Sequence, residues 1–422
     1  MTDRDLDVVV LGATGVTGRL VAAHLAERSS ETGLRWAAAA RDAGKAERVL
    51  SEAGVTAPEM ILADIGDRGS LERLAGRARV VLDLVGPYTL YGRPVIEACI
   101  ARGAHYADLT GEIPFVRSVI DEFDGQARGK GVKVVQVCGF EALPPDLSIM
   151  LAAATARERW EEDLASVELE VSIEPPPGLP RPSDGLSGGT LQSLLAVAGT
   201  EHSELIADPA ALITDETLAA WVRRVSPIPL APHRSRDGQV VAPMTPAPFI
   251  NPAVIHRTTA LTAEAAGRPA APFRYREGIV IAGPPATLPL RWGVAGAMSA
   301  TQLGLRGFAR ATPTVRRTVA GTLARLAPGS GFGPVGERLE GWRWTVQVQA
   351  GTPRGREVGV RIDADGHPGY LSAARMLGEL GMLLAEEGAT PGLAGCLTPA
   401  AALGIARIER FDHARVRFSV SP

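Results

Sequence analysis

The chain has few cysteines, no long hydrophobic run and no excess of positive charge, and each absence excludes a class of protein. Cys99, Cys138 and Cys396 are isolated along 422 residues, so they form neither a disulfide framework nor the spacing of a metal site. No uninterrupted run of about 18 apolar residues exists, which argues against a membrane-spanning helix. A net charge of −3 gives no basic field. We therefore expect no metal and no nucleic acid partner.

The remaining composition is that of a folded protein from a reducing cytoplasm. Residues 1–5 lead directly into an apolar run and resemble neither a signal peptide nor a transit peptide. Apolar residues make up 45% of the chain and charged residues 22%, as in globular proteins. Because 422 residues exceed one ordinary hydrophobic core, two domains are expected.

The first 140 residues or so alternate between strand-like and helix-like patterns. Apolar runs such as residues 8–11, 79–85 and 132–138 are separated by segments with apolar residues at helical spacing. This alternation predicts a parallel sheet with right-handed crossovers, a Rossmann-type α/β unit. Later strand patterns, such as residues 341–350 and 357–362, predict a second α+β domain.

Gly12, Gly15 and Gly18 mark the turn between the first predicted strand and the first predicted helix. A helix N-terminus carries free N–H groups and partial positive charge, and therefore binds a pyrophosphate. Gly12 permits the tight turn, Gly15 lets the backbone approach the phosphates, and Gly18 lets the helix pack on the strand. The spacing is G-x-x-G-x-x-G, so a glycine-rich turn without a ligand is the alternative. We expect Gly12, Thr14, Gly15 and Val16 to contact a dinucleotide.

Arg41 ends the second predicted strand, where the side chain selects between the two nicotinamide cofactors. An arginine here accommodates the 2′-phosphate of NADP, whereas a carboxylate binds the ribose hydroxyls of NAD. Asp42 follows, so NAD stays an alternative, as does a simple solvated charge at Arg41. Asp64, after the third predicted strand, either reaches the adenine or caps the next turn. We expect NADP, bound in part by Arg41 and Asp64.

The fourth predicted strand leads into residues 85–91, at the sheet edge where ligands of α/β folds bind. We expect Gly86 and Pro87 to lie beside the nicotinamide. Tyr88 is a candidate to stack on the nicotinamide or to donate a proton, and Tyr91 is a candidate substrate contact. A half-buried contact with the second domain is the alternative for both tyrosines.

Asp108 and Glu112 straddle the end of the fifth predicted strand, at the same edge. A carboxyl in a partly dry cleft has a raised pKa and can donate a proton, so both are candidate catalytic acids. Capping of the following helix is the alternative. Gly188, Gly189 and Thr190 form a second uncovered helix N-terminus, which either holds a substrate oxyanion or is an ordinary cap.

Residues 285–326 combine apolar stretches with arginines. Such a segment can lie in a membrane interface, cover a tunnel for a hydrophobic substrate, or form a core or homodimer face. We keep peripheral membrane contact and a homodimer as open expectations.

The motifs together resemble the saccharopine dehydrogenase-like oxidoreductases, most closely the trans-acting enoyl reductases of actinobacterial lipid and polyketide synthesis. The resemblance runs almost from end to end and includes residues 397–402. Glu141 stands where relatives often carry Asp, so the carboxylate is retained. The motifs are Gly12-Ala-Thr-Gly15-Val-Thr-Gly18, Ala40-Arg41-Asp42, Val85-Gly86-Pro87-Tyr88, Asp108-Leu-Thr-Gly111-Glu112, Cys138-Gly139-Phe140-Glu141 and Ser187-Gly-Gly-Thr190.

The resemblance implies a Rossmann domain over residues 1–146 and an α+β domain with a mixed sheet, for substrate binding and dimerisation, over residues 147–387. Residues 388–422 are then expected to return to the Rossmann domain. The implied reaction is NADPH-dependent reduction of the carbon–carbon double bond of a hydrophobic enoyl chain, held on an acyl carrier protein of a polyketide synthase. We expect a cytoplasmic enzyme, with the inner face of the plasma membrane as a site of peripheral contact.

Two other functions stay open. One is a saccharopine-type amino acid dehydrogenase, whose dicarboxylate substrate needs clustered basic groups; Arg257, Arg274 and Arg276 are unassigned candidates. The other is a non-catalytic NADP-binding protein that acts at a membrane or beside a synthase.

Overall fold

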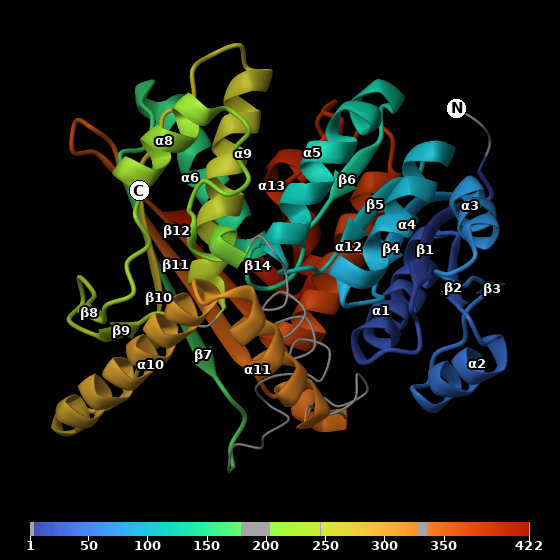
Figure 1. Ribbon diagram of the computed structural model, residues 1–422, viewed down its shortest axis with the longest axis horizontal. Helices are drawn as coiled ribbons and strands as arrows, with labels where there is room; N and C mark the ends of the chain where they lie inside the picture. Colours follow the sequence, from blue (N-terminus) through green and yellow to red (C-terminus); the bar gives the residue numbers. More distant parts are fainter. Residues whose placement is uncertain (1–3, 179–202, 245, 327–335, 422) are drawn as a thin grey trace.

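The chain builds two seven-stranded sheets that lie side by side, as the computed structural model in Figure 1 shows. The structure describes residues 4–178, 203–244, 246–326 and 336–421. The two sheets share a continuous buried core, which joins apolar residues of both units.

The first sheet has the strand order β13-β6-β5-β4-β1-β2-β3, and all its neighbours pair in parallel. Residues 8–11 of strand β1 form an unbroken apolar run because both faces of the sheet are covered there, and Val8, Val9 and Val10 are fully buried. The order 3-2-1-4-5-6 is that of the Rossmann fold, which confirms the predicted fold class. The strands are β1 (Leu6–Leu11), β2 (Trp36–Ala40), β3 (Met60–Leu62), β4 (Ala78–Asp83), β5 (His105–Asp108), β6 (Lys133–Val135) and β13 (Gly395–Leu397).

Five helices connect these strands and cover the sheet (Figure 1), as the crossovers between parallel strands require. They are α1 (Val16–Thr32), α2 (Ala43–Glu52), α3 (Arg68–Arg77), α4 (Tyr88–Arg102) and α5 (Ile113–Lys130).

The second sheet has the strand order β14-β12-β11-β7-β10-β9-β8. It is a mixed sheet, because β7 and β10 pair in parallel while all other neighbouring strands of this sheet pair antiparallel. This confirms the predicted mixed sheet. Its strands are β7 (Ser166–Glu174), β8 (His233–Arg234), β9 (Val240–Ala242), β10 (Arg274–Ile281), β11 (Arg343–Gly351), β12 (Glu357–Asp365) and β14 (Val416–Ser421).

The helices of the second half divide between the two sheets. Helix α6 packs on β11 and β12, whereas α12 packs on α1 and β4 of the first unit. Strand β13 extends the first sheet and β14 extends the second. The predicted boundaries at residues 146 and 387 stay a prediction. The helices are α6 (Leu143–Trp160), α8 (Glu216–Val225), α9 (Asn251–Ala265), α10 (Leu288–Ala309), α11 (Pro313–Leu326), α12 (Ala373–Ala385) and α13 (Pro399–Leu403).

A buried carboxylate fixes α12 against α1. Glu379 is fully buried, and its Oε1 lies 3.0 Å from His24 Nε2 and 2.7 Å from Arg28 Nε. Burial alone would raise the pKa of Glu379, but the hydrogen bond with His24 and the charges of Arg28 and Arg410 hold it below its usual range. The helix that follows the second sheet is therefore held on the first unit by charge as well as by apolar packing.

We expect Glu379→Ala to lower the free energy of unfolding by about 3 to 5 kcal/mol, because Arg28 would stay buried without this partner. Urea denaturation measures the loss. Glu386, the exposed partner of Arg410, offers a control, since Glu386→Ala removes only a surface ion pair of about 1 kcal/mol or less. Equal denaturation midpoints for the two variants would contradict this account.

Candidate active site

The turn between β1 and α1 is pressed against the segment that follows β4. Gly12 has φ +90°, and a Cβ there would lie 2.9 Å from Val85 Cγ2 and 3.0 Å from the Leu84 carbonyl oxygen. A Cβ at Gly18 would overlap the carbonyl oxygen of Gly12. A side chain at Gly18 would push α1 away from the β1 turn, and one at Gly12 would push the turn away from the segment after β4, which explains why both are glycine.

The N-terminus of α1 lacks a capping side chain. Gly15 is the N-cap residue, no side chain accepts from the first N–H groups, and the first turn contains no acidic residue. The side chain of Val16 packs with Tyr370 and Leu371, so its backbone rather than its side chain is left for a ligand. Thr14 is half-buried within the turn. Free N–H groups and an uncompensated helix dipole fit a pyrophosphate.

The ends of β2 and β3 suit NADP better than NAD. Arg41 directly follows β2 and is exposed, whereas the Asp42 carboxylate caps α2 by accepting from the Lys45 N–H at 2.9 Å. Asp64 is exposed, and one of its oxygens accepts from the Gly66 N–H at 2.8 Å. This turn is the alternative stated for Asp64, and its adenine contact stays a prediction. The exposed side chain of Arg41 can meet a 2′-phosphate, and the Asp42 carboxylate is occupied as the cap of α2.

The segment after β4 opens directly into α4. Gly86 is exposed, Pro87 is the N-cap residue of α4, and the side chain of Tyr91 in the first turns is 39% exposed. Leu90 beside it is 61% exposed. An exposed glycine and two exposed apolar side chains thus follow residues 84 and 85, which pack on the Gly12 turn.

Glu112 holds the N-terminus of α4. Its Oε1 accepts from the Tyr88 N–H at 3.0 Å, and its Oε2 accepts from the Thr89 N–H at 2.7 Å and from the Thr89 hydroxyl. The carboxylate is buried and makes no cap on α5, the helix that follows it. It lies where the dipole of α4 favours negative charge. These contacts make Glu112 a positioning group for residues 88 and 89.

The Tyr88 hydroxyl lies between the ends of β4 and β5. It donates to the backbone oxygen of Asp83 at 3.2 Å and accepts from the Leu109 N–H at 3.4 Å. Burial, together with the charges of Asp108 and Asp83, raises the pKa of Tyr88 well above its usual value. The hydroxyl therefore keeps its proton at neutral pH.

Asp83 and Asp108 form a buried acid pair on neighbouring strands, opposite each other in the β4–β5 register. The Tyr106 hydroxyl lies 3.2 Å from Asp83 Oδ2 and 2.9 Å from Asp108 Oδ2. Burial raises the pKa of Asp83 to about 8 and that of Asp108 to about 7. Asp83 was not among the predicted site residues; its only signal is an acid at the end of an apolar run.

Backbone strain occurs beside this pair. Val137, after β6, has φ 64°, and its N–H donates to Asp108 Oδ1 at 3.2 Å. A β-branched residue rarely adopts this conformation, and such outliers concentrate at functional sites. The same carboxylate also accepts from the Thr110 N–H at 3.0 Å, so several backbone groups fix its position.

The structure brings one subset of the predicted site residues together. The Gly12 turn, Gly86, Tyr88 and Asp108 lie at the carboxyl ends of β1, β4 and β5, which are adjacent in the sheet. Arg41 and Asp64 lie farther along the same edge, after β2 and β3.

The second unit reaches the same edge of the first sheet. A Cβ at Gly111 would lie 2.9 Å from Ile250 Cδ1, just before α9. Gly188, Gly189 and Thr190 lie outside the residues that the structure describes.

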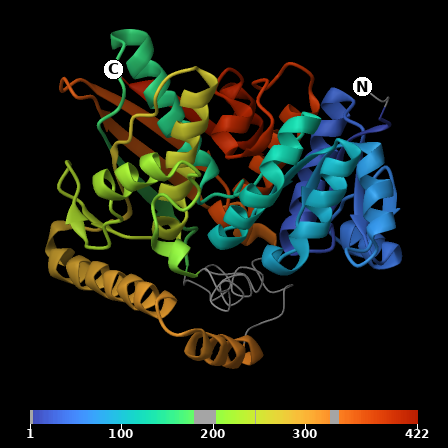
Figure 2. The ribbon, with the colours of Figure 1, turned by 45° about the horizontal axis from the view of Figure 1, so that its top comes forward.

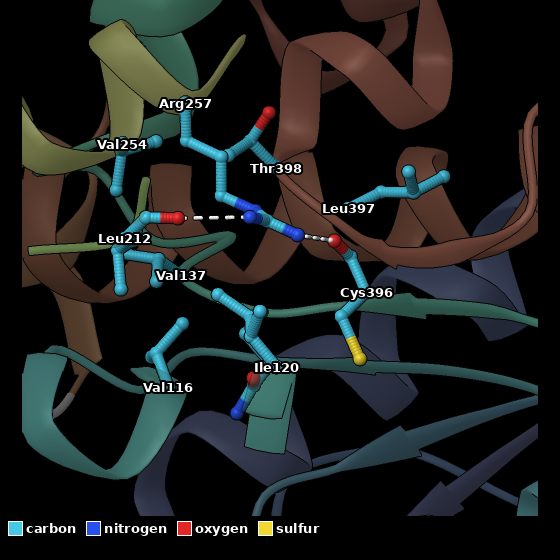
Figure 3. Close-up of a pocket in the computed structure, with 10 residues that line it drawn as sticks. Val116, Ile120, Val137, Leu212, Val254, Arg257, Cys396, Leu397 and Thr398 are labelled. Carbon is cyan, nitrogen blue, oxygen red and sulfur yellow. Dashed lines mark hydrogen bonds between the residues drawn. The ribbon is translucent and has the colours of Figure 1, made fainter. Parts of the chain in front are cut away.

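A small cavity lies deeper between the two units (Figure 3). Only about 10 Å³ is open to the centre of a water molecule, which suits one water and no substrate. The Arg257 guanidinium beside it donates to the carbonyl oxygens of Leu212 at 2.8 Å and Cys396 at 2.7 Å. The Arg257 guanidinium is therefore already hydrogen-bonded to two backbone carbonyls. Arg274 is exposed and Arg276 half-buried on β10.

The described part of the chain has neither a membrane-spanning helix nor a metal-binding cluster. None of its helices has both the length and the apolar character needed to cross a bilayer. It also holds no cluster of three or more His, Cys, Asp or Glu side chains arranged to bind a metal ion.

Comparisons with known proteins give three findings. Residues 8–135 match the family described as the saccharopine dehydrogenase NADP binding domain. A protein of Mycobacterium tuberculosis, named among the trans-acting enoyl reductases, is 34% identical over 98% of this chain and 97% of its own length. The trans-acting enoyl reductase of Mycobacterium ulcerans is 32% identical over 99% of this chain and 98% of its own length.

A solved structure is also similar over the whole length. Saccharopine dehydrogenase (L-Glu forming) from Saccharomyces cerevisiae is 14% identical with a TM-score of 0.48, over 99% of this chain and 100% of that chain.

We expect Gly18→Ala to weaken NADPH binding at least tenfold and to lower stability by about 1 to 3 kcal/mol, because the added methyl must push α1 away from Gly12. Isothermal calorimetry and thermal unfolding measure the two effects. Gly125 on α5 has open space around it, so Gly125→Ala is the matched control and should leave NADPH binding unchanged. Unchanged NADPH affinity in Gly18→Ala would contradict the assigned turn.

The acid pair predicts how stability depends on pH. The pKa of Asp83 is raised from 3.8 to about 8 on folding, so the folded chain binds more protons than the unfolded chain between these values. The contribution of Asp83 to stability is therefore full at low pH and is lost as pH rises toward 8. We expect Asp83→Asn, whose amide cannot ionise, to lose less stability than wild type between about pH 5 and pH 8. Parallel stability profiles from urea titrations would refute the raised pKa.

Proposed function

The chain belongs to the family of the trans-acting enoyl reductases, and from this premise we propose that it reduces the carbon–carbon double bond of a hydrophobic enoyl thioester with NADPH. The chain is an NADP-dependent oxidoreductase of this family. The observation that carries the proposal is the position of the uncapped α1 N-terminus. It lies at the sheet edge that also holds Tyr88 and the buried pair of Asp83 and Asp108.

The residues at the first three strand ends are proposed to bind the cofactor. The backbone N–H groups of residues 14–16 would hold the pyrophosphate, since no side chain caps that end of α1. Arg41 would hold the 2′-phosphate, and Gly86 and Pro87 would flank the nicotinamide. When bound, the reduced cofactor supplies the hydride that is added to the β-carbon of the enoyl group.

Tyr88 is proposed as the group that protonates the α-carbon. Its hydroxyl keeps its proton because burial and neighbouring carboxylates raise its pKa, so the proton leaves only when the α-carbon becomes strongly basic. Asp108, predicted as a catalytic acid, is proposed to act through Tyr106 and Asp83, as part of a proton store that titrates close to neutral pH.

Glu112 is proposed to act through Tyr88 rather than on the substrate. Its carboxylate binds the backbone N–H groups of residues 88 and 89 and so fixes the start of α4. The backbone N–H groups of Gly188 and Gly189 are proposed to donate to the oxyanion of the thioester, and Thr190 is proposed as a further substrate contact.

The acyl chain is proposed to enter over the first turns of α4. Tyr91 and Leu90 expose apolar surface there, and exposed apolar side chains are typical of binding sites for hydrophobic ligands. An amino acid dehydrogenase is less well supported, because Arg257 is already engaged by two backbone carbonyls.

The partner and the location belong to the same proposal. The word trans-acting in the names of the relatives supports a substrate that is delivered by another protein, for which we propose an acyl carrier protein of a polyketide synthase. We further propose a cytoplasmic enzyme with peripheral contact at the inner face of the plasma membrane, and a homodimer as the alternative use of residues 285–326.

We expect purified protein to oxidise NADPH in the presence of an enoyl thioester, followed by loss of the nicotinamide absorbance. Tyr88→Phe should lower kcat about a hundredfold or more while the affinity for NADPH is unchanged, because only the proton donor is lost. Tyr91→Phe keeps the ring and should leave kcat close to wild type.

Two outcomes would contradict the proposal. Tight NADPH binding without turnover of enoyl thioesters of any chain length would favour a non-catalytic protein. Turnover with an amino acid and a keto acid instead would favour the dehydrogenase.

A further inference from the structure

Helix α10 is apolar on both of its sides. Its inner side packs Trp292, Ala295 and Met298 with Val240 and Ala242 of β9. Its outer side exposes large apolar side chains: Leu290 is 68% exposed, Val294 42%, Leu303 57% and Leu305 40%. A surface helix normally presents polar residues outward, so the outer side of α10 is suited to a covering partner.

Three of the four large apolar side chains exposed on α10 lie in one stripe along the helix, together with Ala297 and the polar side chain of Thr301, whereas Leu303 lies outside this stripe. Leu290, Val294, Ala297, Thr301 and Leu305 recur at intervals of three and four residues, so they share one side of a helix that is about 33 Å long. None of these five side chains is charged.

The polar side chains of Arg291 and Gln302 in α10 point inward instead. The Arg291 guanidinium donates to the carbonyl oxygens of Ile281 at 2.6 Å and Gly283 at 3.0 Å, and to Gln239 Oε1 at 2.7 Å. Gln302 is fully buried. The one charged group in the first four turns is thus turned away from the apolar stripe, which leaves the outer side without charge.

Helix α11 continues the same surface. It exposes Val315 by 49% and Val319 by 39%. Figure 2 shows α10 and α11, in orange, following one another along the lower edge of the molecule. We call the outer sides of these two helices the α10–α11 surface. Six of the ten large apolar side chains that are exposed in the described part of the chain belong to it.

The charge of this region is of one sign. Residues 278–336 contain no Asp or Glu, although the whole chain has a net charge of −3. Arg310 is exposed at the junction of α10 and α11, whereas Arg317 lies on a different side of α11 from Val315 and Val319. The arginines of this stretch are Arg291, Arg306, Arg310, Arg316, Arg317 and Arg325.

We propose that the α10–α11 surface binds the surface of an anionic phospholipid bilayer. The apolar stripe would enter the boundary between head groups and acyl chains, and Arg310 would contact phosphate groups. Neither helix is long and apolar enough to span a bilayer, so both would lie on it. The inference rests on the proposed function only for the benefit of membrane binding, since a hydrophobic acyl substrate would concentrate in lipid.

Flotation of the full chain with phospholipid vesicles tests the proposal, without NADPH or substrate. Wild type should bind phosphatidylcholine vesicles that contain phosphatidylglycerol, and bind pure phosphatidylcholine more weakly. The combined variant Leu290→Ser, Val294→Ser and Leu305→Ser should lower binding about tenfold or more. Arg310→Gln should lower binding to the anionic vesicles about fivefold and leave binding to phosphatidylcholine unchanged.

Trp221 on α8 provides the matched control, because it is 42% exposed but lies outside the α10–α11 surface. Trp221→Ser should bind vesicles like wild type, and every variant should keep the NADPH affinity of wild type, which shows that the fold is intact. Absence of wild-type binding to anionic vesicles would overturn the proposal, as would equal binding by the combined variant.

Two other occupants would also overturn the proposal. A homodimer seen by analytical ultracentrifugation and lost in the combined variant would assign the surface to a second copy. Binding of an acidic carrier protein, lost in the combined variant while vesicles do not bind, would assign it to that protein. Loss of enoyl turnover with intact vesicle binding would contradict the proposed function alone.

Discussion

The close packing of α1 on β1 is the constraint on which the site depends. Gly18 lets the helix lie against the Gly12 carbonyl, and Gly12 lets the turn lie against the segment after β4. The uncapped end of α1 is therefore aimed at the edge where β1 and β4 separate. In an open α/β sheet this is the place where the order of strands reverses, and a crevice for a dinucleotide forms there.

Next to this turn, the fold keeps two carboxyls out of water. Asp83 and Asp108 lie on adjacent strands and share the Tyr106 hydroxyl, and a buried pair of this kind holds protons at a pH at which exposed carboxyls have lost them. Glu112 differs because it binds the positive end of α4. Glu112 thus fixes the start of α4, which carries Tyr88, while Asp83 and Asp108 retain protons beside it.

The fold could be predicted from local patterns, whereas part of the site could not. The apolar run before Gly12 and the alternation of strands and helices are local signals, and they predicted the parallel sheet. Glu112 reaches the start of α4 from the N-cap of α5, 23 or 24 positions away, and no local spacing predicts such a contact. Asp83 appears in the sequence only as the end of a strand. The outward apolar stripe of α10 depends on Arg291 turning inward, which only the tertiary contacts show.

A crystal structure of the protein with NADP would test the central claim most directly. The account predicts pyrophosphate oxygens within hydrogen-bond distance of the backbone N–H groups of residues 14–16, and the 2′-phosphate beside Arg41. It also predicts the nicotinamide ring next to Gly86 and Tyr88. A cofactor bound elsewhere, or a pyrophosphate held without the α1 N-terminus, would contradict it.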